Sequence, residues 1–245
     1  MSKTEQKEYV EVTFSKLMIP VAIVLAGGLV ALAIFLGGNG DTEKKDEEKN
    51  GDTVTFSDPD VVPANLKLEV EEGAYIGNLD KAKFAIVEFS DYQCPYCQKH
   101  YTDTFPSIKD KYLGDEDFVY FFREVAFYPP KSMSLSALGQ CIFEEKGVDE
   151  YIEYHGKAFA AEFETDAELL DAMNVTDSKV KECFENETYT GRIDNNSAMT
   201  QTAGMQGVPG FIVGTLSEEG EVDGYLIPGA YPISMFEEVL DHLTQ

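Results

Sequence analysis

KFAIVEFSDYQCPYC, residues 83–97, combines a strand with the start of a helix. Its first eight residues form a near-continuous apolar run, which is typical of a strand covered on both faces. The twenty residues that begin with CPYC predict a helix opening at Cys94. Pro95 is tolerated in a first turn, because its missing N–H would have no helical partner there, whereas Pro106 is expected to kink the helix.

A second strand-like run, FVYFFREV at residues 118–125, follows this helix. Strand, helix and strand in this order form a βαβ unit with parallel strands and a right-handed crossover. The pattern also predicts a short strand at 66–70, helices across about 130–190, a helix at 192–202, strands in GMQGVPGFIVG and EEGEVDGYLIPG, and a final helix at 233–243. We therefore expect an α/β domain with an inserted helical subdomain.

Residues 17–38, LMIPVAIVLAGGLVALAIFLGG, carry no charge. A helix of 22 residues at about 1.5 Å each reaches about 33 Å, enough to cross the hydrocarbon core of a bilayer. We predict a cytoplasmic tail at 1–16, a transmembrane helix at 17–38, a charged solvated linker at 39–62 and the folded domain at 63–245. The alternative is a cleaved signal peptide and a secreted protein, although no A-x-A-like site follows the apolar run.

The chain has 19 Lys and Arg against 45 Asp and Glu, a net charge of −26. This charge repels phosphate backbones, so nucleic acid is not an expected partner. Residues 1–51 hold 6 Lys and 8 acids, which places the acidity in the predicted domain. Solubility or a saline habitat explains the acidity more simply than an acidic binding surface.

Cys94 and Cys97 lie three residues apart on one face of the predicted first turn, close enough to form a small disulfide ring. Unpaired backbone N–H groups and the positive end of the helix dipole favour a thiolate on Cys94, the expected nucleophile. Cys97, one turn further in, is the expected resolving thiol. Zinc sites use the same spacing, but no second C-x-x-C accompanies it, so we predict no metal. We expect His100 to be an ordinary helix residue.

Glu88 stands on the apolar strand, six residues before Cys94. A carboxylate costs stability there unless it has a role or a partner. We interpret Glu88 as a buried acid with a raised pKa that moves protons to and from Cys97. The alternative is a glutamate at the end of the sheet whose carboxylate reaches solvent.

FSDYQCPYC after a strand, Glu88 at its offset, and GVPGFIV at the start of a late strand together resemble the DsbA-like thiol-disulfide oxidoreductases of the thioredoxin superfamily. The resemblance covers about residues 74–245 and implies a thioredoxin fold with a helical insertion. It implies that Pro209 is a cis-proline whose loop faces Cys94, and that the Val208 backbone pairs with bound polypeptide. The alternative for Pro209 is a trans proline that begins a strand.

Similar proteins are membrane-tethered or exported, act on cysteines of translocated chains and are reoxidised by a quinone-linked membrane partner. The resemblance implies the same partners here, and no flavin or nicotinamide cofactor. Pro95 and Tyr96, which separate the two cysteines, are expected to contact substrate and differ from the best-known members. This dipeptide tunes thiolate stability and hence redox poise, so the direction of electron flow stays open.

Cys141 and Cys183 both fall on predicted apolar helix faces in the insertion. Our hypothesis is a structural disulfide that closes the helical subdomain, and the alternative is two separate buried thiols. An oxidising compartment suits both a structural disulfide and a redox-active CPYC. The predicted topology therefore has a cytoplasmic N-terminus and a single pass through the cell membrane, with the catalytic domain outside.

Three functions are compatible with these features. We favour an exported oxidase that introduces disulfides into cysteine-containing polypeptides through a mixed disulfide at Cys94. The same chemistry run backwards would give a disulfide reductase or isomerase. A non-enzymatic, tethered chaperone or binding module would need neither thiol.

Overall fold

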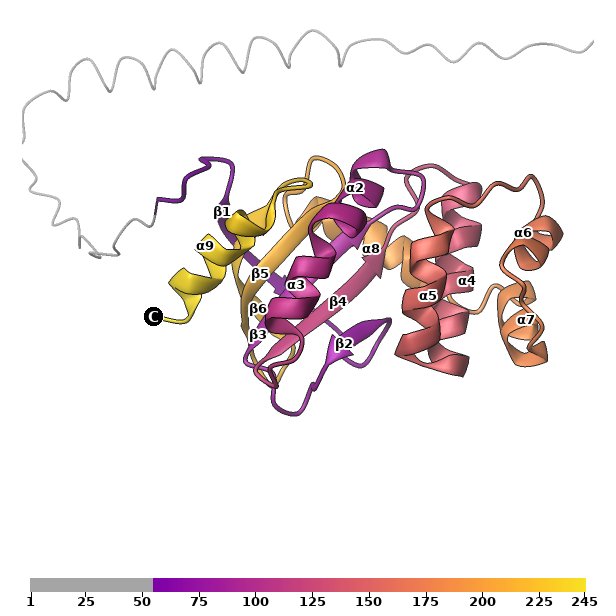
Figure 1. Cartoon of the computed structure of the whole chain (residues 1–245), viewed down its shortest axis with the longest axis horizontal. Helices are drawn as coiled ribbons and strands as arrows, with labels where there is room; N and C mark the ends of the chain where they lie inside the picture. The colour runs from indigo at the N-terminus through magenta and orange to yellow at the C-terminus, as the bar shows by residue number, and fades with distance from the viewer. Residues whose placement is uncertain (1–54) are drawn as a thin grey trace, which may run out of the picture. The chain divides into compact units, whose positions relative to one another are not determined.

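The computed structural model describes residues 55–245, which Figure 1 shows in colour. The predicted cytoplasmic tail (1–16), the predicted transmembrane helix (17–38) and most of the predicted linker (39–62) lie outside these residues. Within residues 55–245, no helix combines the length and the apolar character that crossing a bilayer requires.

The end of the predicted linker is corrected by the structure, because residues before 63 already pack against the folded domain. Phe56 lies edge-on against Tyr225, with ring centroids 4.6 Å apart. Ser57 donates its N–H, at 2.7 Å, and its hydroxyl to the Glu238 carboxylate. The polar composition around Phe56 conceals this boundary in the sequence.

A six-stranded mixed sheet forms the centre of the domain (Figure 1). Its order is β1-β6-β5-β3-β4-β2, with β3 parallel to β4 and antiparallel to β5. The strands are β1 (Val62–Lys67), β2 (Tyr75–Gly77), β3 (Phe84–Ser90), β4 (Phe118–Glu124), β5 (Gly210–Leu216) and β6 (Glu221–Ile227). The inner position of β3 accounts for its apolar run, since strands flank it and helices cover both of its faces.

The helices that cover the sheet are α2 (Pro95–Asp103), α3 (Phe105–Tyr112) and α9 (Ile233–Leu243) on one face and α8 (Thr190–Thr202) on the other. Side chains alternate along β3, so Ile86 packs with α3 and α9, whereas Val87 and Phe89 pack on the α8 side. These two cores hold β3 in place, and β3 leads directly into the turn that carries CPYC.

The predicted βαβ unit is present, but its helix is two helices rather than one kinked helix. α2 ends at Asp103 and α3 begins at Phe105, while Thr104 between them has φ −114° and ψ −45°. Pro106 is the cause, because it lacks an N–H and its ring clashes with the carbonyl one turn earlier in a continuous helix. In the first turn of α3 the same proline meets neither problem.

Two strands differ from the prediction. The first strand is Val62–Lys67 rather than 66–70, because its pairing with β6 runs from Val62 opposite Leu226 to Lys67 opposite Glu221. β2 was not predicted, since its three residues are too few for alternation to be recognised.

The insertion consists of α4 (Lys131–Lys146), α5 (Val148–Ala158), α6 (Asp166–Ala172) and α7 (Ser178–Glu185), which share a hydrophobic core of their own. A disulfide joins Cys141 of α4 to Cys183 of α7, with Cα atoms 5.9 Å apart. The structure therefore joins the two cysteines whose pairing the sequence left open, and the alternative of separate thiols does not describe it.

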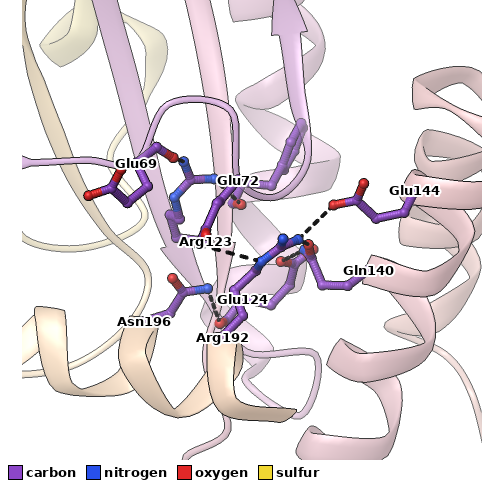
Figure 2. Close-up of polar contacts among 9 residues, drawn as sticks. Glu69, Glu72, Arg123, Glu124, Gln140, Glu144, Arg192 and Asn196 are labelled. Carbon is purple, nitrogen blue, oxygen red and sulfur yellow. Dashed lines mark hydrogen bonds and ion pairs between the residues drawn. The ribbon is translucent and has the colours of Figure 1, made fainter. Parts of the chain in front are cut away.

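Polar contacts around Glu124 join the insertion and α8 to the sheet (Figure 2). Glu124 ends β4; its carboxylate accepts from the Gln140 amide of α4, and its backbone carbonyl accepts from Asn196 of α8. Arg192 of α8 donates to Gln140 Oε1 at 3.0 Å and to Glu144 at 2.8 Å. These bonds fix the helical insertion against the strand that pairs with β3.

Candidate active site

Cys94 is the N-cap residue of α2, at the end of the turn that follows β3, and is 5% exposed. A hydrogen bond from the Cys97 thiol, with further bonds from the backbone N–H groups of Cys97 and Tyr96, lowers the pKa of Cys94 to about 6 against the opposing effect of burial. A first helical turn leaves such N–H groups without helical acceptors. The helix terminus therefore contributes directly to a stabilised thiolate.

Cys97 lies one turn into α2 and is fully buried. Its sulfur accepts the Asp91 N–H at 3.5 Å. Burial raises the pKa of Cys97 well above its ordinary value, and the bond to Cys94 adds to the rise. Near neutral pH, Cys94 is thus a thiolate while Cys97 keeps its proton. This asymmetry suits Cys94 to nucleophilic attack and Cys97 to resolution.

The loop before β5 faces Cys94 from far along the chain. The Val208–Pro209 peptide bond is cis, and the Val208 carbonyl oxygen lies 3.3 Å from Cys94 Sγ. Val208 is half-buried and Pro209 is buried. An extended polypeptide that pairs with the Val208 backbone would therefore carry its own sulfur past Cys94.

Two hollows lie beside the CPYC turn. One, of about 380 Å³, is lined by Tyr96, Lys99, Val208, Pro209, Gly229, Ala230, Tyr231 and Pro232. The other, of about 280 Å³, is lined by Tyr92, Gln93, Cys94, Pro95, Gln98, Phe159, Ala160, Ala161 and Glu162. Tyr96 is 67% exposed. Pro95 and Tyr96 each line one hollow, so both residues are available to the side chains of a bound polypeptide.

Glu88 lies within β3 and is 1% exposed, so its carboxylate does not reach solvent and the sheet-end alternative is wrong. Burial raises the pKa of Glu88 to about 7, although the hydrogen bond from Tyr120 and then the nearby Ser90 hydroxyl oppose the rise. Tyr120 donates its hydroxyl to Glu88 Oε2 at 2.7 Å. A carboxyl with this pKa can both accept and release a proton near neutral pH.

Tyr120 and His100 complete the surroundings of Glu88. Because Tyr120 gives its single proton to Glu88, His100 Nε2, 3.2 Å from the tyrosine oxygen, must be the donor in that second contact. Burial lowers the pKa of His100 to about 3, so the imidazole is neutral. The expectation of an ordinary helix residue was incomplete, since His100 is a buried donor. Only the register of β3 against β4 could have drawn attention to Tyr120.

Asp91 is a second buried acid in the site, and the sequence analysis did not select it. Its carboxylate accepts the N–H groups of Gln93 and Phe127, both at 2.7 Å, and the Ser132 hydroxyl at 2.8 Å. These bonds tie the turn before Cys94 to the segment that leads into α4. The sequence signal that could have identified Asp91 is its position as an acidic residue between an apolar strand and CPYC.

The site thus combines two unlike thiols, a buried carboxyl and a cis-proline loop. Such groups can exchange disulfides with an extended polypeptide and move the proton that accompanies each exchange. In the part of the chain that the structure describes, no three His, Cys, Asp or Glu side chains are grouped so as to hold a metal ion.

A family profile described as Thioredoxin matches residues 69–221, more than half of the chain. The chain belongs to the thioredoxin family. Disulfide bond formation protein D of Bacillus subtilis (strain 168) is 28% identical over 140 residues, which are 53% of this chain and 63% of that protein. The match therefore spans less than two thirds of the length of this relative.

Solved structures share the fold of this thioredoxin-family chain. Oxidised BdbD from Bacillus subtilis has a TM-score of 0.60 and 22% identity, and the alignment covers 75% of this chain and 99% of that one. The thiol-disulfide exchange protein alpha-DsbA2 from Wolbachia pipientis has a TM-score of 0.55 and 19% identity, with 70% and 87% covered. The predicted thioredoxin-like α/β fold with a helical insertion is confirmed.

Proposed function

We propose that this protein is a membrane-tethered, extracytoplasmic thiol-disulfide oxidoreductase that introduces disulfides into exported, cysteine-containing polypeptides. The observation that carries the proposal is the contrast between Cys94, with a pKa of about 6, and the buried, protonated Cys97. A stabilised thiolate favours the reduced form of the couple, which makes the disulfide form an oxidant. The Bacillus relative, named for disulfide bond formation, supports the same chemistry.

Oxidation of a substrate dithiol takes two exchange steps. A substrate thiolate attacks the Cys94 sulfur of the Cys94–Cys97 disulfide, and the electron pair of the broken S–S bond leaves on Cys97, which takes a proton. The second substrate thiol loses its proton to solvent and attacks the substrate sulfur of the mixed disulfide, so that Cys94 leaves as a thiolate. Two electrons have then passed from the substrate to the protein, and the substrate holds a new disulfide.

Other residues of the site hold the substrate and supply the proton. The Val208 backbone pairs with the substrate in strand fashion, and Pro209 keeps that backbone opposite Cys94. Pro95 and Tyr96 contact side chains that enter the two hollows. Glu88, with its pKa raised by burial to about 7, provides the proton that Cys97 takes.

We place the domain outside the cell membrane, held by residues 17–38, with secretion after signal cleavage as the alternative. The Cys141–Cys183 disulfide supports this location, because structural disulfides persist in oxidising compartments. The DsbA-like resemblance supports a quinone-linked membrane partner that reoxidises Cys94 and Cys97. Protease added outside intact, wall-less cells should degrade the domain, and protection of the domain would contradict this location.

A redox titration of Cys94 and Cys97, followed by alkylation and the mass shift of the protein, tests the direction of electron flow. An oxidase requires a potential closer to about −120 mV than to about −270 mV. A value at the reducing end would favour the reductase or isomerase. In cells, Cys97→Ser should accumulate covalent substrate adducts, which dithiothreitol should reverse. A non-enzymatic binding module would instead keep its activity in Cys94→Ser.

A further inference from the structure

Ser90 is the last residue of β3, two positions after Glu88. Because side chains alternate along a strand, the two residues point to the same face of the sheet. Ser90 is 5% exposed, and among residues 55–245 neither its hydroxyl nor Glu88 Oε1 has a hydrogen-bond partner. Buried polar atoms nearly always have partners, so two unpartnered atoms beside a redox-active thiol indicate a use in the reaction.

The Ser90 hydroxyl lies close to both the Glu88 carboxyl and the Cys97 thiol. Burial raises the pKa of each of these groups, and the Ser90 hydroxyl beside them lowers the pKa of each. The next residue, Asp91, donates its N–H to Cys97 Sγ at 3.5 Å and so holds the chain at Ser90 beside this sulfur. A serine hydroxyl rotates, donates one proton and accepts at two lone pairs, so it can bond to both neighbours at once.

Tyr120 leaves only one carboxyl oxygen for Ser90, because its hydroxyl already donates to Glu88 Oε2. His100, which contacts Tyr120, does not compete for the proton, since burial lowers its pKa to about 3. The other titratable groups that act on Glu88 or on the two thiols come from the turn before α2, from α2 itself and from β4. They are Asp91, Tyr92 and Cys94 of the turn, Tyr101 of α2 and Glu124 of β4.

We propose that the Ser90 hydroxyl passes the proton between the Glu88 carboxyl and the Cys97 thiol. This step rests on the proposed function and adds the residue that connects its acid to its buried sulfur. When a substrate thiolate opens the Cys94–Cys97 disulfide, the Cys97 sulfur leaves with the electron pair and takes the hydroxyl proton of Ser90. The Ser90 oxygen takes the proton of the Glu88 carboxyl, which becomes a carboxylate. Reoxidation reverses these transfers.

Ser90→Ala tests the relay through the rate at which dithiothreitol reduces the oxidised protein, measured by quenching, alkylation and mass shift. In the wild-type protein, the rate per dithiothreitol thiolate should fall as the pH rises through about 7, the pKa of Glu88. Ser90→Ala should be about 100-fold slower below this pH and should lose the pH step, since general acid catalysis contributes about 10²- to 10⁴-fold. Ser136→Ala removes another fully buried hydroxyl, from α4, and should keep the wild-type profile.

A double-mutant cycle that combines Ser90→Ala with Glu88→Gln distinguishes a proton relay from a structural role of Ser90. If Ser90 acts through Glu88, Ser90→Ala should cause no further loss of rate in the Glu88→Gln protein. An additive loss, or a wild-type profile in Ser90→Ala, would overturn the relay. The near-isosteric pair Ser90→Thr and Ser90→Val repeats the comparison if alanine disturbs the fold, because only threonine keeps the hydroxyl. Absence of any exchange in the wild-type protein would instead contradict the proposed function itself.

Discussion

At the scale of single residues, Cys94 depends on Cys97 for its low pKa, because the Cys97 thiol supplies the largest of the effects that lower it. Cys97→Ala should therefore raise the pKa of Cys94 from about 6 toward the value of about 8.5 for an unperturbed thiol. The measurement is the pH dependence of iodoacetamide alkylation at Cys94, followed by mass. Cys97→Ser keeps a hydroxyl donor and should keep a low midpoint. An unchanged midpoint in Cys97→Ala would assign the shift to the helix terminus alone.

Glu88 reduces the stability of the protein as the pH rises. Burial raises its pKa from 4.5 to about 7, so the folded chain binds this proton more tightly than the unfolded chain does. The free energy of unfolding should consequently fall as the pH rises from about 4.5 through about 7. Glu88→Gln removes this loss. Across that interval, the free energy of unfolding of the variant should rise by about 3 kcal/mol relative to that of wild type.

Urea unfolding at the two ends of this pH interval measures the effect of Glu88. Glu218→Gln is the matched control, since it makes the same substitution at an exposed position. The other buried acid with a raised pKa, Glu124, is common to all three proteins and cancels in the comparison. If the free energies of unfolding of Glu88→Gln and wild type changed in parallel with pH, ionisation of Glu88 in the folded protein would cost little stability.

At the scale of elements, the disulfide between α4 and α7 closes a loop of 42 residues. Closure of such a loop restricts the unfolded chain and should contribute about 4 kcal/mol to stability. Cys141→Ala combined with Cys183→Ala should lower the free energy of unfolding by about this amount, measured by denaturant titration. Exchange at Cys94 and Cys97 should persist at temperatures where the variant stays folded. Equal stability of variant and wild type would show that the shared apolar core alone holds α4 to α7.

Elements with local signals could be predicted from the sequence. β3 and α2 follow from an apolar run and from a CPYC turn whose proline fits a helix start. The break at Thr104 required a choice that the sequence pattern does not make, because Pro106 is compatible with a kinked helix and with a new first turn. β2 exists only because β4 pairs with it, and three residues carry no periodicity of their own.

At the scale of the whole molecule, the candidate site likewise combines residues that a local sequence signal marks with residues that only the fold brings together. The approach of Val208 to Cys94 joins residues 114 positions apart, and only the family resemblance placed them together before the structure did. Ser90 and Tyr120 come from different strands, and their meeting at Glu88 depends on the register that sets Glu88 opposite Phe122. Neither residue type is unusual in a strand, so no sequence signal marked this arrangement.

The net charge of −26 gives a final prediction, about the approach of thiols to Cys94. A negative field repels anions, so a thiolate whose charge is balanced by an ammonium group should reduce the oxidised protein about ten-fold faster than a thiolate that also carries a carboxylate at low salt. Salt at about 1 M shortens the Debye length to about 3 Å and should remove most of this difference.

Cysteamine, mercaptoethanol and mercaptoacetate serve as probes, because their thiolates carry net charges of about 0, −1 and −2. The cysteamine rate should depend least on salt and the mercaptoacetate rate most. Rates are compared per thiolate, because the three thiols differ in pKa and the thiolate is the attacking species. A ratio of the cysteamine rate to the mercaptoacetate rate that stays constant from about 10 mM to about 1 M salt would place the acidic residues electrostatically remote from Cys94. The acidity would then serve solubility alone, and substrate charge would not influence the first exchange step.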